Sequence, residues 1–373
     1  VLAALTSCGG SKKGGLPDFG DDEFALGYYL VDTSLGVLCG LDTTAPDVTI
    51  EEKNEVPTIE KTVKDSNDNW VDSNTAKIGD TVEYKAVITV KTANTNYVMH
   101  DTMTDGLTFN KDSVKVTVSG ADVPTTKYTL SAPGTKGETF SIAFDNNYIA
   151  SLPADTKIEV TYNAVVNEKA KIDPGANENE AYLTFGNSQE TAHDKTYTYL
   201  YQFDLIKYSG TSGKLLGGAQ FILYDAETGG NEIKLVKDNT TGIYRVATAT
   251  EIANHNTVDH IETVPGQTVR ISGLDKKVYW LDEILPPAGY NDLPGRAKVD
   301  LQSGSKTALA DRLTNGYDEA NASSIGGVPI VNNAGTTLPG TGGIGTTIFY
   351  VIGGGLMAAA AILLITKKRM ENR

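Results

Sequence analysis

A two-residue alternation of apolar and polar side chains limits the fold of this chain more than any other feature. It is clearest in residues 82–90, where the apolar positions are Val82, Tyr84, Ala86, Ile88 and Val90. It returns in residues 114–118 and 158–162. Successive side chains of a strand point to opposite faces, so the alternation predicts half-buried strands. Pro-Gly pairs at 133–134, 174–175 and 265–266 predict turns between strands. We therefore predict an all-β fold of two tandem β-sandwiches.

The length of 373 residues leaves room for two or three domains. We predict an N-terminal segment at 1–55, sandwiches at 56–196 and 197–334, and a C-terminal segment at 335–373. The N-terminal segment is rich in Gly and Asp and too short for a sandwich, so it is interpreted as a remnant domain with a linker. Its apolar start and Cys8 resemble the end of a signal peptide or a loose lipoprotein box. A truncated start and a lipidated start both stay open.

The charge and the cysteine content exclude several classes of function. Lys and Arg total 32 against 47 acidic residues, a net charge of -15, which disfavours a nucleic acid partner. Both cysteines, Cys8 and Cys39, lie in the N-terminal segment, so the predicted sandwiches contain neither a disulfide nor a cysteine zinc site. The turn at Asp65, Asn67 and Asn69 departs from a calcium loop. We expect no cofactor, no metal and no enzyme activity on external substrates.

The C-terminal segment has the composition of a membrane anchor. Residues 344–366 carry no charge and are long enough to cross a bilayer as a helix. Lys367, Lys368 and Arg369 follow at once, which predicts a cytoplasmic tail and an extracellular remainder.

A short motif precedes this apolar span. It consists of Leu338, Pro339, Gly340, Thr341 and Gly342. It resembles the LPxTG sorting motif of wall-anchored Gram-positive proteins, and the order of motif, span and basic tail strengthens that resemblance. The resemblance implies that a sortase cleaves after Thr341 and joins it to an amine of the peptidoglycan precursor or of another subunit. The implied location is the outside of the cell, anchored to the wall after transient membrane insertion.

Charged and amide side chains occupy apolar faces in the second predicted sandwich. Lys207 shares its face with Phe203 and Leu205. Glu283 likewise falls on an apolar face, and so does Asn332, whereas Asn333 falls on the other face. An unpaired buried charge is costly, so we expect these residues to meet. The choice of Asn332 over Asn333 stays open.

The first predicted sandwich repeats the arrangement. Lys61, Asp101 and Asn179 each share a face with apolar neighbours. Each sandwich thus offers a lysine in its first strand, an acid in its middle and an asparagine in its last strand. An ordinary buried ion pair is the alternative interpretation of both sets.

Longer stretches resemble two pilin domain families. Residues 281–290, LDEILPPAGY, resemble the E-box of Cna-B-type domains, and residues 203–207 and 217–224 resemble the opening strands of that domain. Residues 57–190 resemble the fimbrial isopeptide-forming domain, on the stretches 78–82, 100–101 and 106–109. The chain is therefore similar to sortase-assembled Gram-positive pilins over residues 57–373.

The resemblance implies one intramolecular Lys–Asn isopeptide bond in each sandwich. The implied sets are Lys207 and Asn332 with Glu283, and Lys61 and Asn179 with Asp101. Burial would free a neutral lysine amine as the nucleophile, and the acid would polarise the amide while ammonia leaves.

Two functions remain open at this point. The first is a pilin shaft subunit, in which Lys53 is the candidate lysine that attacks the sorting motif of the next subunit. The second is a monomeric anchored adhesin that uses the same domains as a stalk. Residues 48–54, VTIEEKN, resemble in their spacing the V-x-V-Y-P-K-N type sequence that carries the linking lysine of pilins. Glu51 and Glu52 stand where that sequence has Tyr and Pro. A host surface ligand is a further partner that stays open for both functions.

Overall fold

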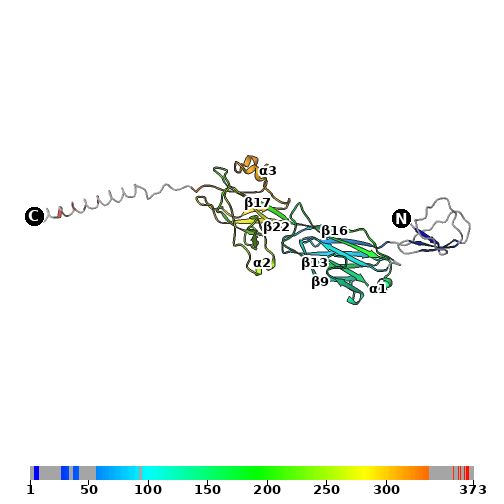
Figure 1. Cartoon of the computed structure of the whole chain (residues 1–373). Coiled ribbons are helices and arrows are strands. Elements are labelled where there is room, and N and C mark those ends of the chain that lie inside the picture. Colours follow the sequence, from blue (N-terminus) through cyan, green and yellow to red (C-terminus); the bar gives the residue numbers. More distant parts are fainter. Residues whose placement is uncertain are drawn as a thin grey trace.

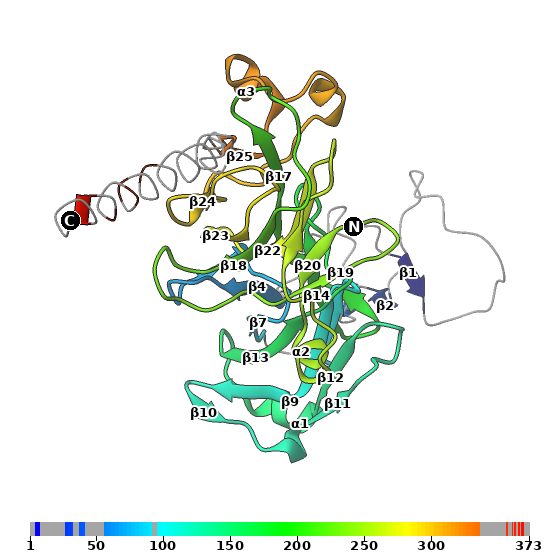
Figure 2. The ribbon, with the colours of Figure 1, turned by 90° about the vertical axis from the view of Figure 1, so that its left-hand side faces the viewer.

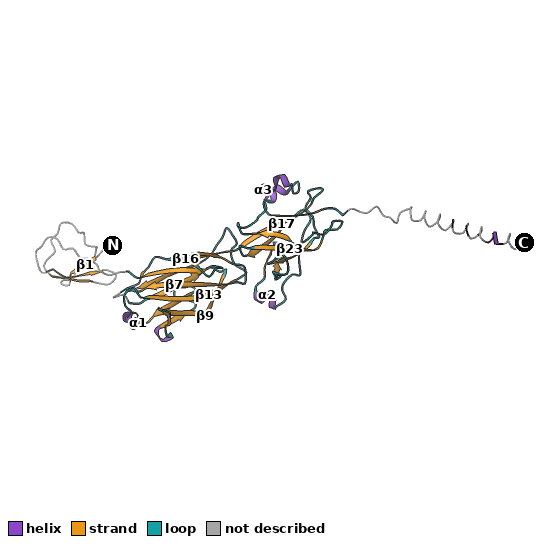
Figure 3. Cartoon of the chain, turned by 180° about the vertical axis from the view of Figure 1, so that it is seen from behind, coloured by secondary structure: helices purple, strands orange, loops and turns teal. Residues whose placement is uncertain are grey.

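The computed structural model describes residues 56–91 and 95–335, three short N-terminal strands, and positions 356, 360, 362, 365, 367 and 368. The N-terminal strands form a small antiparallel sheet in the order β1-β2-β3. Their bounds are β1 Ala4–Ser7, β2 Gly27–Asp32 and β3 Val37–Leu41. The described part of the chain is mostly β-sheet, with a few short helices (Figure 3).

Residues 56–199 form two facing sheets, here called the first module. One sheet has the order β10-β9-β13-β7-β4-β5 and the other β11-β12-β8-β14-β16-β6, with β15 added to β14. The strands of the first sheet are β4 Thr58–Lys64, β5 Trp70–Val71, β7 Thr81–Thr89, β9 Leu107–Val118, β10 Ala121–Asp122 and β13 Lys157–Val166. Those of the second are β6 Ser73–Thr75, β8 Val98–Met103, β11 Tyr128–Ser131, β12 Phe140–Phe144, β14 Asn177–Phe185, β15 Gln189–Glu190 and β16 Asp194–Tyr199. The helices of this module are η1 Thr125–Lys127 and α1 Asn146–Ser151.

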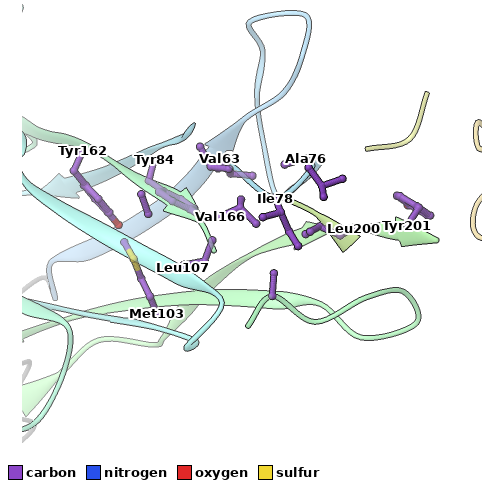
Figure 4. Packing of buried hydrophobic residues seen from close by; sticks show 14 of the residues in the cluster. Val63, Ala76, Ile78, Tyr84, Met103, Leu107, Tyr162, Val166, Leu200 and Tyr201 are labelled. Carbon is purple, nitrogen blue, oxygen red and sulfur yellow. The ribbon is translucent and has the colours of Figure 1, made fainter. Parts of the chain in front are cut away.

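The predicted alternation places the core between these two sheets. In β7, Val82, Tyr84, Ala86 and Ile88 are buried while the residues between them are exposed or half-buried. Figure 4 shows part of this core, where Tyr84 and Tyr162 lie side by side. Their rings stack with centroids 5.6 Å apart.

Residues 201–335 form a second pair of sheets, here called the second module. The two sheets have the orders β19-β20-β22-β17-β25 and β21-β18-β23-β24. The strands are β17 Tyr201–Ser209, β18 Gln220–Tyr224, β19 Leu235–Lys237, β20 Tyr244–Val246, β21 Ile261–Glu262, β22 Val269–Leu274, β23 Val278–Leu285, β24 Ala297–Asp300 and β25 Val328–Asn332. The helices are α2 Ala249–Ala253, η2 Ala310–Leu313, η3 Glu319–Asn321 and α3 Ala322–Ile325.

The first and last strands of the second module are neighbours. β17 and β25 run parallel, with Lys207 opposite Ile330 and Ser209 opposite Asn332 (Figure 2). β25 is the last strand of its sheet, and Pro329 lies exposed in it. A proline has no N–H to donate, so it is tolerated in an edge strand where its nitrogen faces away from the neighbouring strand.

The strands of the two modules meet at residue 200, close to the predicted boundary at 196/197. β16 continues to Tyr199, with Thr196 and Thr198 buried and paired to β14. These threonines hold the strand in the first module because their side chains are part of its interior. Leu200, itself fully buried, is the one residue between β16 and β17.

The two modules lie end to end and touch at this junction (Figure 1). The Ile78 N–H donates to the Gly273 carbonyl across the junction at 3.0 Å. Gly273 has φ +79°, and a Cβ built on it would lie 2.5 Å from Ile78 Cδ1. The close approach therefore depends on the missing side chain as well as on the backbone conformation.

We expect Gly273→Val to loosen the junction between the modules. The added side chain would displace Ile78, so small-angle scattering should show a wider range of overall dimensions than the wild-type chain shows. Gly266→Val is the matched control, because Gly266 has φ +74° and no atom near its Cβ position. A residue with a Cβ is strained in the left-handed conformation, so the free energy of unfolding should fall by about 1–2 kcal/mol in both variants. The control should nevertheless keep the wild-type scattering. Unchanged scattering for Gly273→Val would contradict the role of this contact.

Among the described residues, no helix is both long enough and apolar enough to span a membrane. The predicted span at 344–366 falls almost entirely outside those residues.

Candidate functional site

The predicted lysine of the second module lies in the interior between its sheets. Lys207 is 1% exposed, in a strand whose residues are nearly all buried. Its Nζ contacts Asn332 Oδ1 and lies 2.8 Å from Glu283 Oε1. The side chains of Lys207 and Glu283 are both fully buried. The structure thus brings together all three residues of the predicted set.

The amide of Asn332 is held on its nitrogen side. Nδ2 donates to both carboxyl oxygens of Glu283, at 3.1 and 3.0 Å, and to the Asn291 carbonyl at 3.0 Å. Glu283 Oε2 also accepts from the Leu293 N–H at 3.1 Å. Asn333 is exposed, so Asn332 is the asparagine that faces the lysine.

Strand order explains how these residues meet. Lys207 and Asn332 come from adjacent strands of one sheet, β17 and β25, while Glu283 reaches in from β23 of the facing sheet. Burial lowers the pKa of Lys207, and Glu283 offsets part of that effect. The Phe221 ring, centred 5.3 Å from Nζ, adds to the apolar surroundings. A buried lysine with a lowered pKa is a better nucleophile, because more of it carries the neutral amine.

The first module holds the second predicted set in a different arrangement. Lys61, Asp101 and Asn179 are at most 1% exposed. Lys61 Nζ contacts Asp101 Oδ2 and the Tyr162 hydroxyl. That hydroxyl also donates to Asp101 Oδ2 and accepts from Asn179 Nδ2 at 3.4 Å. Tyr162 therefore stands between the lysine and the asparagine.

The elements of this cluster come from both sheets. Lys61 and Tyr162 lie on β4 and β13 of one sheet, and Asp101 and Asn179 on β8 and β14 of the other. A Lys61–Asn179 bond would thus join two facing sheets, whereas a Lys207–Asn332 bond would join neighbouring strands. Asp101 Oδ1 and Asn179 Oδ1 have no hydrogen-bond partner among the described residues.

Burial governs the protonation states in this cluster. It lowers the pKa of Lys61, an effect that Asp101 partly offsets, and it raises the pKa of Asp101. Burial also raises the pKa of Tyr162 well above its ordinary value, and the nearby Asp101 charge adds to the rise. The lysine amine, the carboxylic acid and the phenol are therefore all pushed toward their neutral forms.

Sequence reasoning missed two partners of these sites. Tyr162 lies in the alternating stretch 158–162, and that pattern indicates an inward face without indicating what its hydroxyl meets. The Asn291 carbonyl belongs to the loop after β23, where a backbone oxygen leaves no signal in the side-chain pattern.

Other predicted sites fall outside the described residues or lack a ligand set. Lys53 and the motif 338–342 lie outside them. No group of three or more metal-binding side chains of His, Cys, Asp or Glu occurs within the described part of the chain. Asp65 Oδ1 instead accepts from the N–H groups of Asn67 and Asn69, which closes a turn.

Comparisons with known proteins bear on both the anchor and the fold. The model of the LPXTG cell wall anchor motif matches residues 330–372. The full-length major pilin RrgB of Streptococcus pneumoniae superposes with a TM-score of 0.53 at 15% identity, over 83% of this chain and 81% of that one. The chain is a wall-anchored extracellular protein with a pilin fold.

Further comparisons extend the likeness to other pilin-fold proteins. The 35 kDa C-terminal fragment of the major pilin GBS80 of Streptococcus agalactiae has a TM-score of 0.53 at 20% identity, over 75% of this chain and all of the fragment. The T6 backbone pilin of serotype M6 Streptococcus pyogenes has a TM-score of 0.51 at 19% identity, over 82% of this chain and 71% of that one. In sequence, the chain is 26% identical to the trypsin-resistant surface T6 protein of Streptococcus pyogenes serotype M6 over 230 residues. That match spans 52% of this chain and 41% of the T6 protein.

Proposed function

We propose that this chain is a shaft subunit of a covalent, sortase-assembled pilus, stabilised by one isopeptide bond in each module. The wall anchor motif and the pilin fold support this role. The structural relatives also support it, because they include a backbone pilin and two major pilins. The proposed architecture is two tandem Ig-like sandwiches, the second of Cna-B type, followed by a sorting helix at 344–366.

The contact of Lys207, Glu283 and Asn332 is the observation that carries the isopeptide part of this proposal. Nζ touches the amide oxygen, and Glu283 is within hydrogen-bond distance of both the lysine nitrogen and the amide nitrogen. A neutral Nζ attacks the Asn332 side-chain carbon, and Glu283 passes the released proton to Nδ2. The new Nζ–C bond forms, the C–Nδ2 bond breaks, and ammonia leaves.

Covalent assembly uses the two segments that flank the modules. Sortase would cleave after Thr341 and form an acyl-enzyme at its carbonyl. The Lys53 amine of the next subunit would then resolve that intermediate in the shaft, and an amine of the peptidoglycan precursor would resolve it at the base. The protein is a substrate in both steps, and it supports adhesion through the fibre that it builds.

We expect a detergent-resistant ladder of high-mass bands when wall extracts of the native host are boiled and immunoblotted. Lys53→Ala should abolish the ladder, because each step of the polymer needs that amine. Lys111→Ala is the matched control, since Lys111 is an exposed lysine of the first module, and it should leave the ladder intact.

The other outcomes separate the remaining alternatives. A ladder that survives Lys53→Ala keeps the pilus and moves the linking amine to another residue. A single wall-attached band in the wild type would contradict the shaft role and favour a monomeric anchored adhesin with these modules as its stalk.

A further inference from the structure

The two candidate sites differ in how the acid reaches the amide nitrogen. In the second module, Glu283 lies within hydrogen-bond distance of both Lys207 Nζ and Asn332 Nδ2. In the first module the acid is an aspartate, one methylene shorter. The contacts of Asp101 run to Lys61 and to the Tyr162 hydroxyl, and that hydroxyl makes the contact with Asn179 Nδ2.

We propose that Tyr162 is a catalytic residue of the first module, whose hydroxyl relays a proton from Lys61 Nζ to the departing nitrogen of Asn179. This inference rests on the proposed isopeptide bond of that module. It assigns to the Tyr162 hydroxyl the proton transfer that Glu283 performs in the second module.

The step balances without any further reactant. The lone pair of neutral Lys61 Nζ attacks Asn179 Cγ, and the carbonyl electrons move to Oδ1. Nζ gives one proton to Tyr162 Oη, which releases its own hydrogen to Nδ2. The carbonyl re-forms, the Cγ–Nδ2 bond breaks with its electron pair on nitrogen, and ammonia leaves. Tyr162 ends as a neutral hydroxyl, ready in the same position.

The surroundings of Tyr162 suit such a relay. Burial keeps the phenol neutral by raising its pKa, so the hydroxyl retains a hydrogen to pass on. The ring meets Phe140 edge to face at 4.9 Å and stacks on Tyr84 at 5.6 Å, contacts that restrict its movement. The hydroxyl accepts from Lys61 Nζ and, at 3.4 Å, from Asn179 Nδ2, so it lies within reach of both the attacking and the leaving nitrogen. Its own hydrogen, directed at Asp101 Oδ2, turns to Nδ2 during the transfer.

The test follows bond formation in the full chain made by cell-free synthesis. Samples are quenched at intervals and digested, and the linked peptides are counted by mass spectrometry across a range of pH. Tyr162→Phe should slow the Lys61–Asn179 bond on the order of 100-fold, a usual loss for a missing acid–base group, and change its pH profile. The Lys207–Asn332 bond in the same digest should keep its wild-type rate.

Tyr84→Phe is the matched control. It also removes one buried hydroxyl from the same core, and its ring lies 5.5 Å from Lys61 Nζ. It should leave the rate and the pH profile of both bonds unchanged. Limited proteolysis of each variant reports whether the first module has folded.

A rescue variant separates a relay from a structural role. Asp101→Glu added to Tyr162→Phe supplies the longer acid of the second module, and it should restore much of the lost rate. A wild-type rate in Tyr162→Phe would overturn the relay, and so would a folded double variant that forms no bond. A wild-type chain with the second bond but without the first would instead overturn the proposed bond of the first module.

Discussion

Asn332→Ala is expected to leave the purified chain short of one ammonia relative to its sequence mass, where the wild type is short of two. The second module should then unfold at a much lower temperature. The lost bond would close a loop of 125 residues. Without it the unfolded chain regains the entropy that the closed loop removes, which lowers the free energy of unfolding by about 5 kcal/mol. Intact-mass spectrometry measures the first effect, and calorimetry the second.

Asn333→Ala provides the control, because Asn333 is the exposed neighbour on the same chain segment. It should keep both the mass deficit and the unfolding temperature of the wild type. If Asn332→Ala retained the full mass deficit, or if Asn333→Ala lost part of it, the assignment of the bonded asparagine would be wrong.

Lys61→Ala should have an effect of similar size on the first module. The nucleophile is gone, so the bond between the facing sheets cannot form. The free energy of unfolding of the first module should fall by about 5 kcal/mol, because the unfolded chain again gains the entropy of an open loop. Calorimetry of the full chain measures it, with the second module as an internal reference. Lys64→Ala is the control, because Lys64 lies in the same strand with a partly exposed side chain paired to Asp68 and Glu83. The free energy of unfolding of Lys64→Ala should fall by no more than about 1 kcal/mol.

The same variant should also respond to pH. Asp101 would stay buried without its lysine, and burial raises its pKa in the folded chain above the unfolded value. The unfolded chain then gives up its proton first as the pH rises. The free energy of unfolding of Lys61→Ala should therefore fall as the pH increases above the ordinary aspartate range. A stability independent of pH there would contradict the burial of an unpaired acid.

The alternation of side chains was sufficient to predict which residues face the interior. Lys207 and Asn332, like Lys61 and Asn179, are nearly fully buried, on the faces that the period-two pattern indicated. The pattern succeeds because the side-chain direction in a strand depends only on parity. A charged residue on an apolar face is unusual enough to stand out.

The same pattern could not predict which strands would be neighbours. Sheet order depends on pairings between residues far apart in the chain, so parity does not tell that β17 adjoins β25 while β4 faces β14 across the interior. The contact of Tyr162 with Lys61 depends on the order β13-β7-β4 within one sheet, and it was missed for this reason. The predicted boundary at 196/197 lies within β16, whose pairing with β14 is another contact between distant residues that the side-chain pattern does not contain.

The proline in β25 has a consequence for neighbouring copies on a crowded cell wall. An open strand edge presents unpaired N–H and C=O groups, and such groups can join the sheet of another molecule. The Asn332 carbonyl accepts from the Gly210 N–H just after β17, so the N–H positions of residues 329 and 331 lie on the open edge of β25. Pro329 removes one of these two donors. Copies that lie side by side therefore find this edge a poor place for a shared sheet. Lateral clumping through β25 is disfavoured, and each molecule keeps its own sheets.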